Sequence, residues 1–159
     1  MKAILILLAC WRCAYALNTA LDISQYAHKS WTVREGFFKG SIWSIAQTPD
    51  GYLWLGTEFG LVRFDGVQEV PWLPPKGESL PHNWVTRLLA SRDGRLWIGT
   101  RDGLASWKDG RLTRYPHMDG WIVGALIEDR EGTIWAGGSA ITLAARGETA
   151  YFHAAPEII

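Results

Sequence analysis

The stretch DGYLWLGT, residues 50–57, returns as DGRLWIGT at residues 93–100 and, less closely, as EGTIWAGG at residues 131–138. The tryptophans of successive copies are 43 and then 38 residues apart, from 54 to 97 and from 97 to 135. A period of about forty residues indicates stacked supersecondary units, and it decides the fold class. We interpret the positions that the copies share as structural: Asp50, Gly51, Trp54, Gly56, Asp93, Gly94, Trp97, Gly99, Gly132 and Trp135.

The first copy predicts four short strands joined by tight turns. Pro49 presets φ for a turn, while Asp50 and Gly51 supply the hydrogen-bonding side chain and the positive φ that turns use. Asp65-Gly66 indicates a two-residue hairpin between the last two strands. No segment of the copy carries apolar residues at helical spacing. We therefore predict an antiparallel meander with strands over residues 42–47, 52–57, 61–64 and 67–70.

The other two copies follow the same pattern. The second predicts strands over residues 85–90, 95–100, 104–107 and 111–115. The third predicts strands over residues 122–128, 133–138, 141–145 and 148–153, but it departs from the pattern at two positions. Ile141 replaces the turn glycine that the earlier copies have as Gly60 and Gly103, and Gly138 replaces their threonine.

The second strand of each copy is apolar at successive positions, which indicates burial on both faces. Sheets of this kind pack face to face around a ring, as in a β-propeller. We therefore predict an all-β partial β-propeller of about three four-stranded antiparallel blades in an open arc. Trp54, Trp97 and Trp135 would pack between blades, with a carbohydrate-stacking platform as the alternative. The expected blades cover about residues 41–70, 84–115 and 121–153.

Three blades do not close a ring, because propellers have about 4–8. We therefore expect the chain to be a fragment of a longer protein or the product of a truncated gene. We expect its blades to pack against the further blades of the full-length protein. Expressed alone, it would expose the apolar faces of its terminal blades and would aggregate or fold only partly.

Residues 1–16 have the features of a signal peptide. Lys2 precedes an apolar run too short to cross a bilayer, and Ala14-Tyr15-Ala16 offers a small-x-small cleavage site. Lipidation at Cys10 is the alternative, because residues 7–10 resemble a lipobox. Both cysteines precede the cleavage site, so the exported chain would rely on packing and not on disulfides. We expect residues 17–40 to hold one strand, over residues 25–33, and a linker, and residues 41–159 to hold the repeats.

Composition and scattered polar residues argue against several classes of function. Lys and Arg number 16, as do Asp and Glu, so no basic stripe indicates nucleic-acid binding. Asp50, Asp93 and Glu131 recur in turns of successive blades and would not converge as glycosidase carboxylates do. The four histidines are scattered, and no Gly-x-Ser-x-Gly motif is present. We predict no catalytic residues, no metal site and no cofactor, and keep a propeller lyase or glycosidase fragment as the least favoured alternative.

A ligand site in a propeller is expected near the central axis, on the loops that lead into the first strand and join the second to the third. Aromatic, amide and charged side chains gather in those loops and would suit a glycan or another polar ligand. Trp84 and Trp121 could instead be packing residues, with the others solvated. The candidate ligand-binding residues are Glu58, Phe59, His82, Trp84, Arg101, Asp102, His117 and Trp121, with Asn83 and Ser139 beside them.

Residues 42–66 closely resemble the bacterial two-component regulator propeller repeat. With Ser41 before them and Val67 after them, they have the sequence SIWSIAQTPDGYLWLGTEFGLVRFDGV. The segment before the first blade also resembles the usual start of such proteins. It contains Tyr26, His28 and Trp31-Thr32, followed by Glu35-Gly36. The resemblance extends over about residues 22–150 and is looser in the third copy.

The resemblance implies a periplasmic sensor region of a signal-transduction protein. In that family, propeller repeats precede an immunoglobulin-like domain, a membrane helix and a cytoplasmic histidine kinase, often hybrid, or a diguanylate cyclase. No kinase histidine box, nucleotide loop or second hydrophobic span occurs in this sequence, so membrane attachment would depend on missing C-terminal parts. A structural or adhesive propeller without signalling is the main alternative to ligand sensing.

Overall fold

The structure, a computed structural model, describes residues 30–31, 39–140 and 150–154. Within these residues the regular elements are β-strands and one short 3-10 turn, which confirms the predicted all-β class. The expected signal peptide at residues 1–16 lies outside the described residues. So does the expected strand at residues 25–33, except for Ser30 and Trp31, which are not in a strand.

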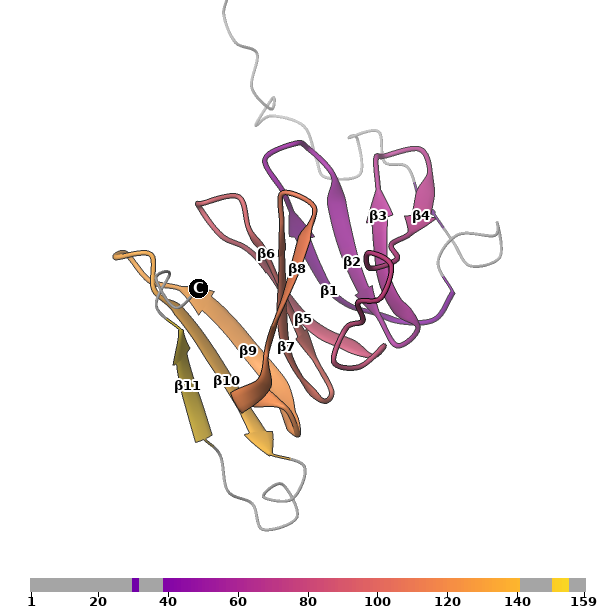
Figure 1. Cartoon of the computed structure of the whole chain (residues 1–159). Helices are drawn as coiled ribbons and strands as arrows, with labels where there is room; N and C mark the ends of the chain where they lie inside the picture. Colours follow the sequence, from indigo (N-terminus) through magenta and orange to yellow (C-terminus); the bar gives the residue numbers. More distant parts are fainter. Residues whose placement is uncertain (1–29, 32–38, 141–149, 155–159) are drawn as a thin grey trace, which may run out of the picture. The chain divides into compact units, whose positions relative to one another are not determined.

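The first two repeats each form a four-stranded antiparallel sheet whose strands lie side by side in chain order (Figure 1). This arrangement is the predicted meander. The first sheet consists of β1 (Ile42–Gln47), β2 (Leu53–Thr57), β3 (Gly60–Phe64) and β4 (Glu69–Pro71). The second consists of β5 (Val85–Ala90), β6 (Leu96–Thr100), β7 (Gly103–Lys108) and β8 (Arg111–Tyr115), and the 3-10 turn η3 (Pro116–Met118) follows it.

The hairpins that end these two sheets differ. Between β7 and β8, Asp109 and Gly110 have φ of 50° and 78°, as the tight hairpin turn with two positive φ angles requires. The predicted two-residue hairpin at Asp65-Gly66 is wrong, because β3 ends at Phe64 and β4 begins only at Glu69. The Asp65 carboxylate accepts hydrogen bonds of 2.8 and 2.7 Å from the backbone N–H groups of residues 67 and 68. Those residues are therefore held in the connection and not in the strand.

The third repeat forms a sheet in the order β11-β10-β9 from β9 (Trp121–Glu128), β10 (Ile134–Ala140) and β11 (Ala150–Ala154). The segment predicted as its fourth strand, residues 148–153, corresponds to β11, which pairs directly with β10 and so takes the third place. The predicted third strand, residues 141–145, lies outside the described residues. Gly60 and Gly103 turn directly from second to third strand with φ of 132° and 128°. Ile141 stands where the third repeat would need such a glycine, so this repeat does not encode the same tight turn.

The first strands of successive sheets contact one another, β1 against β5 and β5 against β9. Trp54 and Trp97 are each only 4% exposed. Trp54 packs with Val85 and Leu88 of the second sheet, and Trp97 packs with residues of the third sheet that include Val123. For these two tryptophans the predicted position between blades is observed.

Trp135 differs from its two counterparts, since it is 44% exposed. In this structure Trp135 is therefore not buried between blades, and its burial in a complete propeller stays a prediction. Trp54 and Trp97 are covered by the sheet that follows each of them. The described residues contain no sheet that follows the third one, so the equivalent side of the third sheet faces solvent.

The glycine of the repeated Trp-x-Gly-Thr phrase lets the next sheet approach closely. A Cβ on Gly56 would lie 2.7 Å from Val85 Cγ1, and a Cβ on Gly99 would lie 2.6 Å from Val123 Cγ1. Polar contacts also cross between the sheets: Ser44 Oγ accepts a 2.9 Å hydrogen bond from the N–H of Leu88. Gly56 and Gly99 are therefore required by the close approach of the neighbouring sheet and not by a turn of their own sheet.

Candidate ligand-binding rim

Most of the candidate site residues lie at one end of the sheets, which we call the loop rim. An antiparallel meander places the start of its first strand and the turn between its second and third strands at the same end. The loop rim therefore carries the β2–β3 turn (residues 58–59), the β6–β7 turn (residues 101–102) and the loops that lead into β1, β5 and β9.

Two tryptophans and an arginine lie in a row on the loop rim. The ring centroids of Trp43 and Trp84 are 5.6 Å apart, with the ring planes inclined by 51°. The guanidinium carbon of Arg101 lies 4.7 Å from the Trp84 ring centroid, within the range of a cation–π contact. The backbone N–H of Arg101 also donates a 3.0 Å hydrogen bond to the carbonyl oxygen of Trp84. Contacts from both neighbours thus hold the half-buried Trp84, while Trp43 is 50% exposed.

Glu58 continues the row on the side of Trp43. Its Oε2 accepts a 3.3 Å hydrogen bond from Trp43 Nε1, and its two carboxylate oxygens accept bonds of 3.1 and 2.9 Å from the backbone N–H of Ser41. The pKa of Glu58 is lowered because its own backbone N–H, that of Ser41 and the Trp43 indole donate to the charged carboxylate. The carboxylate is therefore ionised at neutral pH.

We call Glu58, Trp43, Trp84 and Arg101 the rim row. The row offers a carboxylate that accepts hydrogen bonds, an exposed indole face and a guanidinium that donates them. In general, groups of these three kinds are suited to the apolar face and the hydroxyls of a sugar. Three of its members were candidates from the sequence. Trp43 was missed, although it stands where the second repeat has Thr86, and an aromatic residue that breaks a repeat was the available signal.

Three other candidates have structural contacts. Asp102 Oδ1 accepts a 2.9 Å hydrogen bond from the N–H of Gly120 and so joins the second sheet to the loop that leads into β9. His82 Nδ1 accepts a 2.9 Å bond from the N–H of Trp84. Trp121 is partly buried against the core beside the third sheet. These contacts favour the packing interpretation for Trp121 and assign a loop-ordering role to Asp102 and His82.

The remaining candidates lie on the surface of the loop rim. Phe59 is 69% exposed at the β2–β3 turn. His117 lies in η3, with its ring edge-on to Tyr115 at a centroid distance of 6.3 Å. Asn83 is exposed and Ser139 is half-buried.

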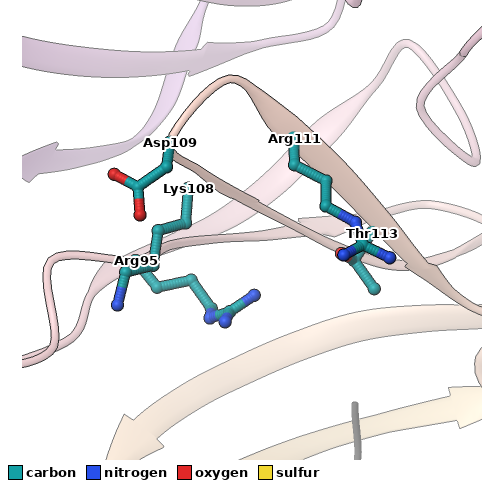
Figure 2. A pocket seen from close by; sticks show the side chains of 5 residues that line it. All are labelled: Arg95, Lys108, Asp109, Arg111 and Thr113. Atoms are coloured by element: carbon teal, nitrogen blue, oxygen red, sulfur yellow. The ribbon is translucent and has the colours of Figure 1, made fainter.

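Pockets lined by described residues occur at the other end of the sheets, and the candidate ligand-binding residues do not line these pockets. One pocket of about 280 Å³ lies beside the β7–β8 hairpin and is lined by Arg95, Lys108, Asp109, Arg111 and Thr113 (Figure 2). In the part of the chain that the structure describes, no three His, Cys, Asp or Glu side chains are grouped so that they could hold a metal ion. A search of the same residues for a helix long and apolar enough to span a bilayer found none.

Sequence comparison identifies the repeats. Residues 36–59 and 79–102 match the family described as two component regulator propeller. The chain therefore carries two-component regulator propeller repeats, and the resemblance noted from residues 42–66 is confirmed. No curated protein sequence matches the chain.

Structural comparison gives extracellular domains of bacterial signalling systems and a lyase. An extracellular domain assigned to a one component system of B. thetaiotaomicron is 20% identical with a TM-score of 0.55, over 74% of this chain and 17% of that one. An extracellular domain assigned to a hybrid two component system of the same organism is 22% identical with a TM-score of 0.49, over 71% and 16%. Virginiamycin B lyase from Staphylococcus aureus is 16% identical with a TM-score of 0.46, over 71% and 41%. The chain thus has the fold of a propeller segment and spans under a fifth of the two extracellular domains.

Proposed function

We propose that this chain is the extracytoplasmic, ligand-sensing propeller segment of a two-component signal-transduction sensor. Two observations support the proposal: the two-component regulator propeller repeats at residues 36–59 and 79–102, and the fold shared with an extracellular domain of a bacterial signalling system. In this proposal further blades complete the propeller, and a histidine kinase elsewhere in the full-length protein carries the output. The segment itself binds and does not catalyse.

The ligand is a glycan or a similar polar molecule, and it binds on the loop rim. The single observation that carries this part is the rim row. Trp43 presents half of its surface to solvent, with the ionised Glu58 on one side and the Trp84–Arg101 pair on the other. An indole face bordered by a fixed acceptor and a fixed donor suits a pyranose ring, which has both an apolar face and hydroxyls.

Calorimetric titration of the intact protein with a panel of neutral oligosaccharides tests the site. Trp43→Ala should weaken binding of the oligosaccharide that binds wild type by about thirtyfold, about 2 kcal/mol, since a central aromatic contact contributes that much. Trp43→Phe keeps an aromatic face and should lose less. Val67→Ala, an exposed substitution in the β3–β4 connection at the other end, is the control. Unchanged affinity in Trp43→Ala would place the ligand elsewhere.

Sensing and adhesion differ in their consequence for the full-length protein. A sensor changes its phosphotransfer rate when the oligosaccharide binds, whereas an adhesive propeller does not. The same Trp43→Ala variant should shift the oligosaccharide concentration for half-maximal phosphotransfer by the factor measured in the titration. Binding without any change in phosphotransfer would favour the adhesive role.

A further inference from the structure

The pocket beside the β7–β8 hairpin gathers cations on one face of the second sheet. Trp97, Ser106 and Thr113 lie opposite one another across β6, β7 and β8. Side chains two residues apart along a strand point to the same face, so Arg95, Lys108 and Arg111 lie on this face too. Figure 2 shows the Arg111 guanidinium beside Thr113, with the Arg95 side chain extending toward them and the Asp109 carboxylate pointing away from Arg111.

The Arg95 side chain is fixed by its contacts and still has unused hydrogen-bond donors. Its side chain is only 13% exposed, its Nε lies 3.6 Å from Asp93 Oδ2, and its Nη1 donates a 3.1 Å hydrogen bond to Ser106 Oγ. A guanidinium has five N–H groups. These two contacts occupy two of the five, which leaves three without a partner among the described residues.

The acidic side chains nearby do not neutralise the pocket. The Asp93 carboxylate forms ion pairs with both Arg95 and Lys108, and the Lys108 Nζ lies 3.1 Å from Asp93 Oδ2. Its other oxygen accepts bonds from Ser91 Oγ and from the N–H of Arg95. Arg111 forms no ion pair with any described residue. The three cations of the pocket outnumber its two carboxylates, Asp93 and Asp109. The pocket therefore has a net positive charge next to the guanidinium N–H groups that lack a partner.

The equivalent place in the first sheet is closed. There Arg63 lies opposite Trp54, as Ser106 lies opposite Trp97, and Tyr52 occupies the position of Arg95. The Arg63 guanidinium carbon lies 4.4 Å from the Tyr52 ring centroid, so the ring covers the cation. In the second sheet Ser106 is too small to cover the Arg95 guanidinium in this way. The guanidinium carbon lies 5.9 Å from the Trp97 ring centroid, and the Arg95 side chain keeps 13% of its surface exposed. The open cationic pocket is thus a feature of the second repeat and not of the repeat pattern.

We propose that this pocket binds a small oxyanion group, with Arg95 and Arg111 as its charged ligands and the Thr113 hydroxyl as a third donor. Guanidinium groups donate paired hydrogen bonds to carboxylate, sulfate and phosphate oxygens. The volume of about 280 Å³ suits such a group with a short attached skeleton, such as a monosaccharide acid, and not an oligosaccharide. This site lies at the opposite end of the sheet from the rim row and goes beyond the sensing proposal.

Calorimetric titration of the intact protein with sodium glucuronate, sodium sulfate and glucose tests the proposal. Glucuronate or sulfate should bind, and glucose should not bind at this site. Tighter binding of glucuronate than of sulfate would identify the sugar acid as the ligand, and equal binding would identify the free anion. Failure of both anions to bind would overturn the proposal, and it would leave the rim row untouched because the titrations there use neutral oligosaccharides.

Matched variants locate the site. Arg111→Gln changes an exposed residue and should weaken anion binding at least about tenfold without affecting the fold, and Arg95→Gln should do the same or more. Arg114→Gln is the control, since Arg114 lies on the same strand but on the opposite face, paired with Asp119 at 3.3 Å. An equal loss in Arg114→Gln, or wild-type affinity in Arg111→Gln, would show general surface attraction and refute the site. A correctly folded Arg111→Gln protein keeps the test valid if Arg95→Gln does not fold.

Discussion

The indole Nε1 of Trp54 donates a 2.8 Å hydrogen bond to Thr48 Oγ1, six residues earlier at the end of β1. The same bond recurs from Trp97 to Ser91 at 3.2 Å and from Trp135 to Asp129 Oδ2 at 2.8 Å. In the first two repeats the hydroxyl also donates to the turn aspartate, at 2.5 Å to Asp50 and 2.6 Å to Asp93. In the first two repeats the turn and the buried tryptophan are therefore one hydrogen-bonded unit, which explains why Asp-Gly-x-x-Trp recurs as a phrase there.

Removing this acceptor should destabilise the protein. Thr48→Val leaves the N–H of the buried Trp54 indole without its partner and should lower the free energy of unfolding by about 1–3 kcal/mol. Thr48→Ser keeps the hydroxyl and should remain close to wild type. Urea denaturation of the intact protein gives both values. If the two variants are equally stable, the hydroxyl bond does not contribute to the unit.

Truncating the buried tryptophans should cost more. Trp54→Ala or Trp97→Ala leaves a large cavity between sheets and should lower the free energy of unfolding by about 3–5 kcal/mol. Losses below about 1 kcal/mol in the intact protein would favour an exposed ligand platform over a packing role for these residues.

Trp135 tests for further blades in the full-length protein. On the surface described here it is 44% exposed, so Trp135→Ala should cost under about 1 kcal/mol if no sheet covers it. If a following blade covers it as the third sheet covers Trp97, the cost should approach that of Trp97→Ala. Denaturation of the full-length protein decides between these outcomes, and we expect the larger cost.

Gly56 and Gly99, which the next sheet approaches closely, should not tolerate a methyl group. Gly56→Ala places a Cβ 2.7 Å from Val85 Cγ1 and should destabilise by about 1–3 kcal/mol through overpacking. Gly124→Ala is the control, because its Cβ would meet nothing closer than the Gly137 carbonyl oxygen at 3.7 Å. Thermal denaturation of the two variants should show a clear loss for Gly56→Ala and little change for Gly124→Ala.

Asp93 should make stability depend on pH in the acid range. Desolvation raises its pKa, but hydrogen bonds from Ser91, the N–H of Arg95 and Lys108 outweigh it and lower the pKa from 3.8 to about 2. A carboxyl whose folded pKa is depressed stabilises the fold above its unfolded pKa and loses that contribution as pH falls through the folded value. Wild type should therefore lose stability between about pH 4 and pH 2, and Asp93→Asn should lose less across that window. Parallel curves for both proteins in urea titrations from pH 5 to pH 2 would contradict this assignment.

Sequence periodicity and turn chemistry determined most of the fold, because both act over a few residues. The repeat placed the strands of the first two sheets, and the Trp54 and Trp97 positions indicated the cores between them. The failures also have local causes: the Asp65 side chain binds the next two N–H groups and lengthens one connection, and the third repeat lacks the glycine of the tight turn.

The architecture follows from the residue pattern alone: an all-β array of Trp-centred repeats whose loops carry polar and aromatic side chains. Which of those side chains contact one another depends on how the strands and sheets pack in three dimensions. Trp43 and Trp84 are distant along the chain, and their 5.6 Å contact depends on how two sheets pack. The cationic pocket depends on strand register, which places residues from β6, β7 and β8 on one face. Period and turn chemistry specify the conformation of a segment, whereas contacts across strands and sheets follow from three-dimensional packing, and the candidate sites are made of such contacts.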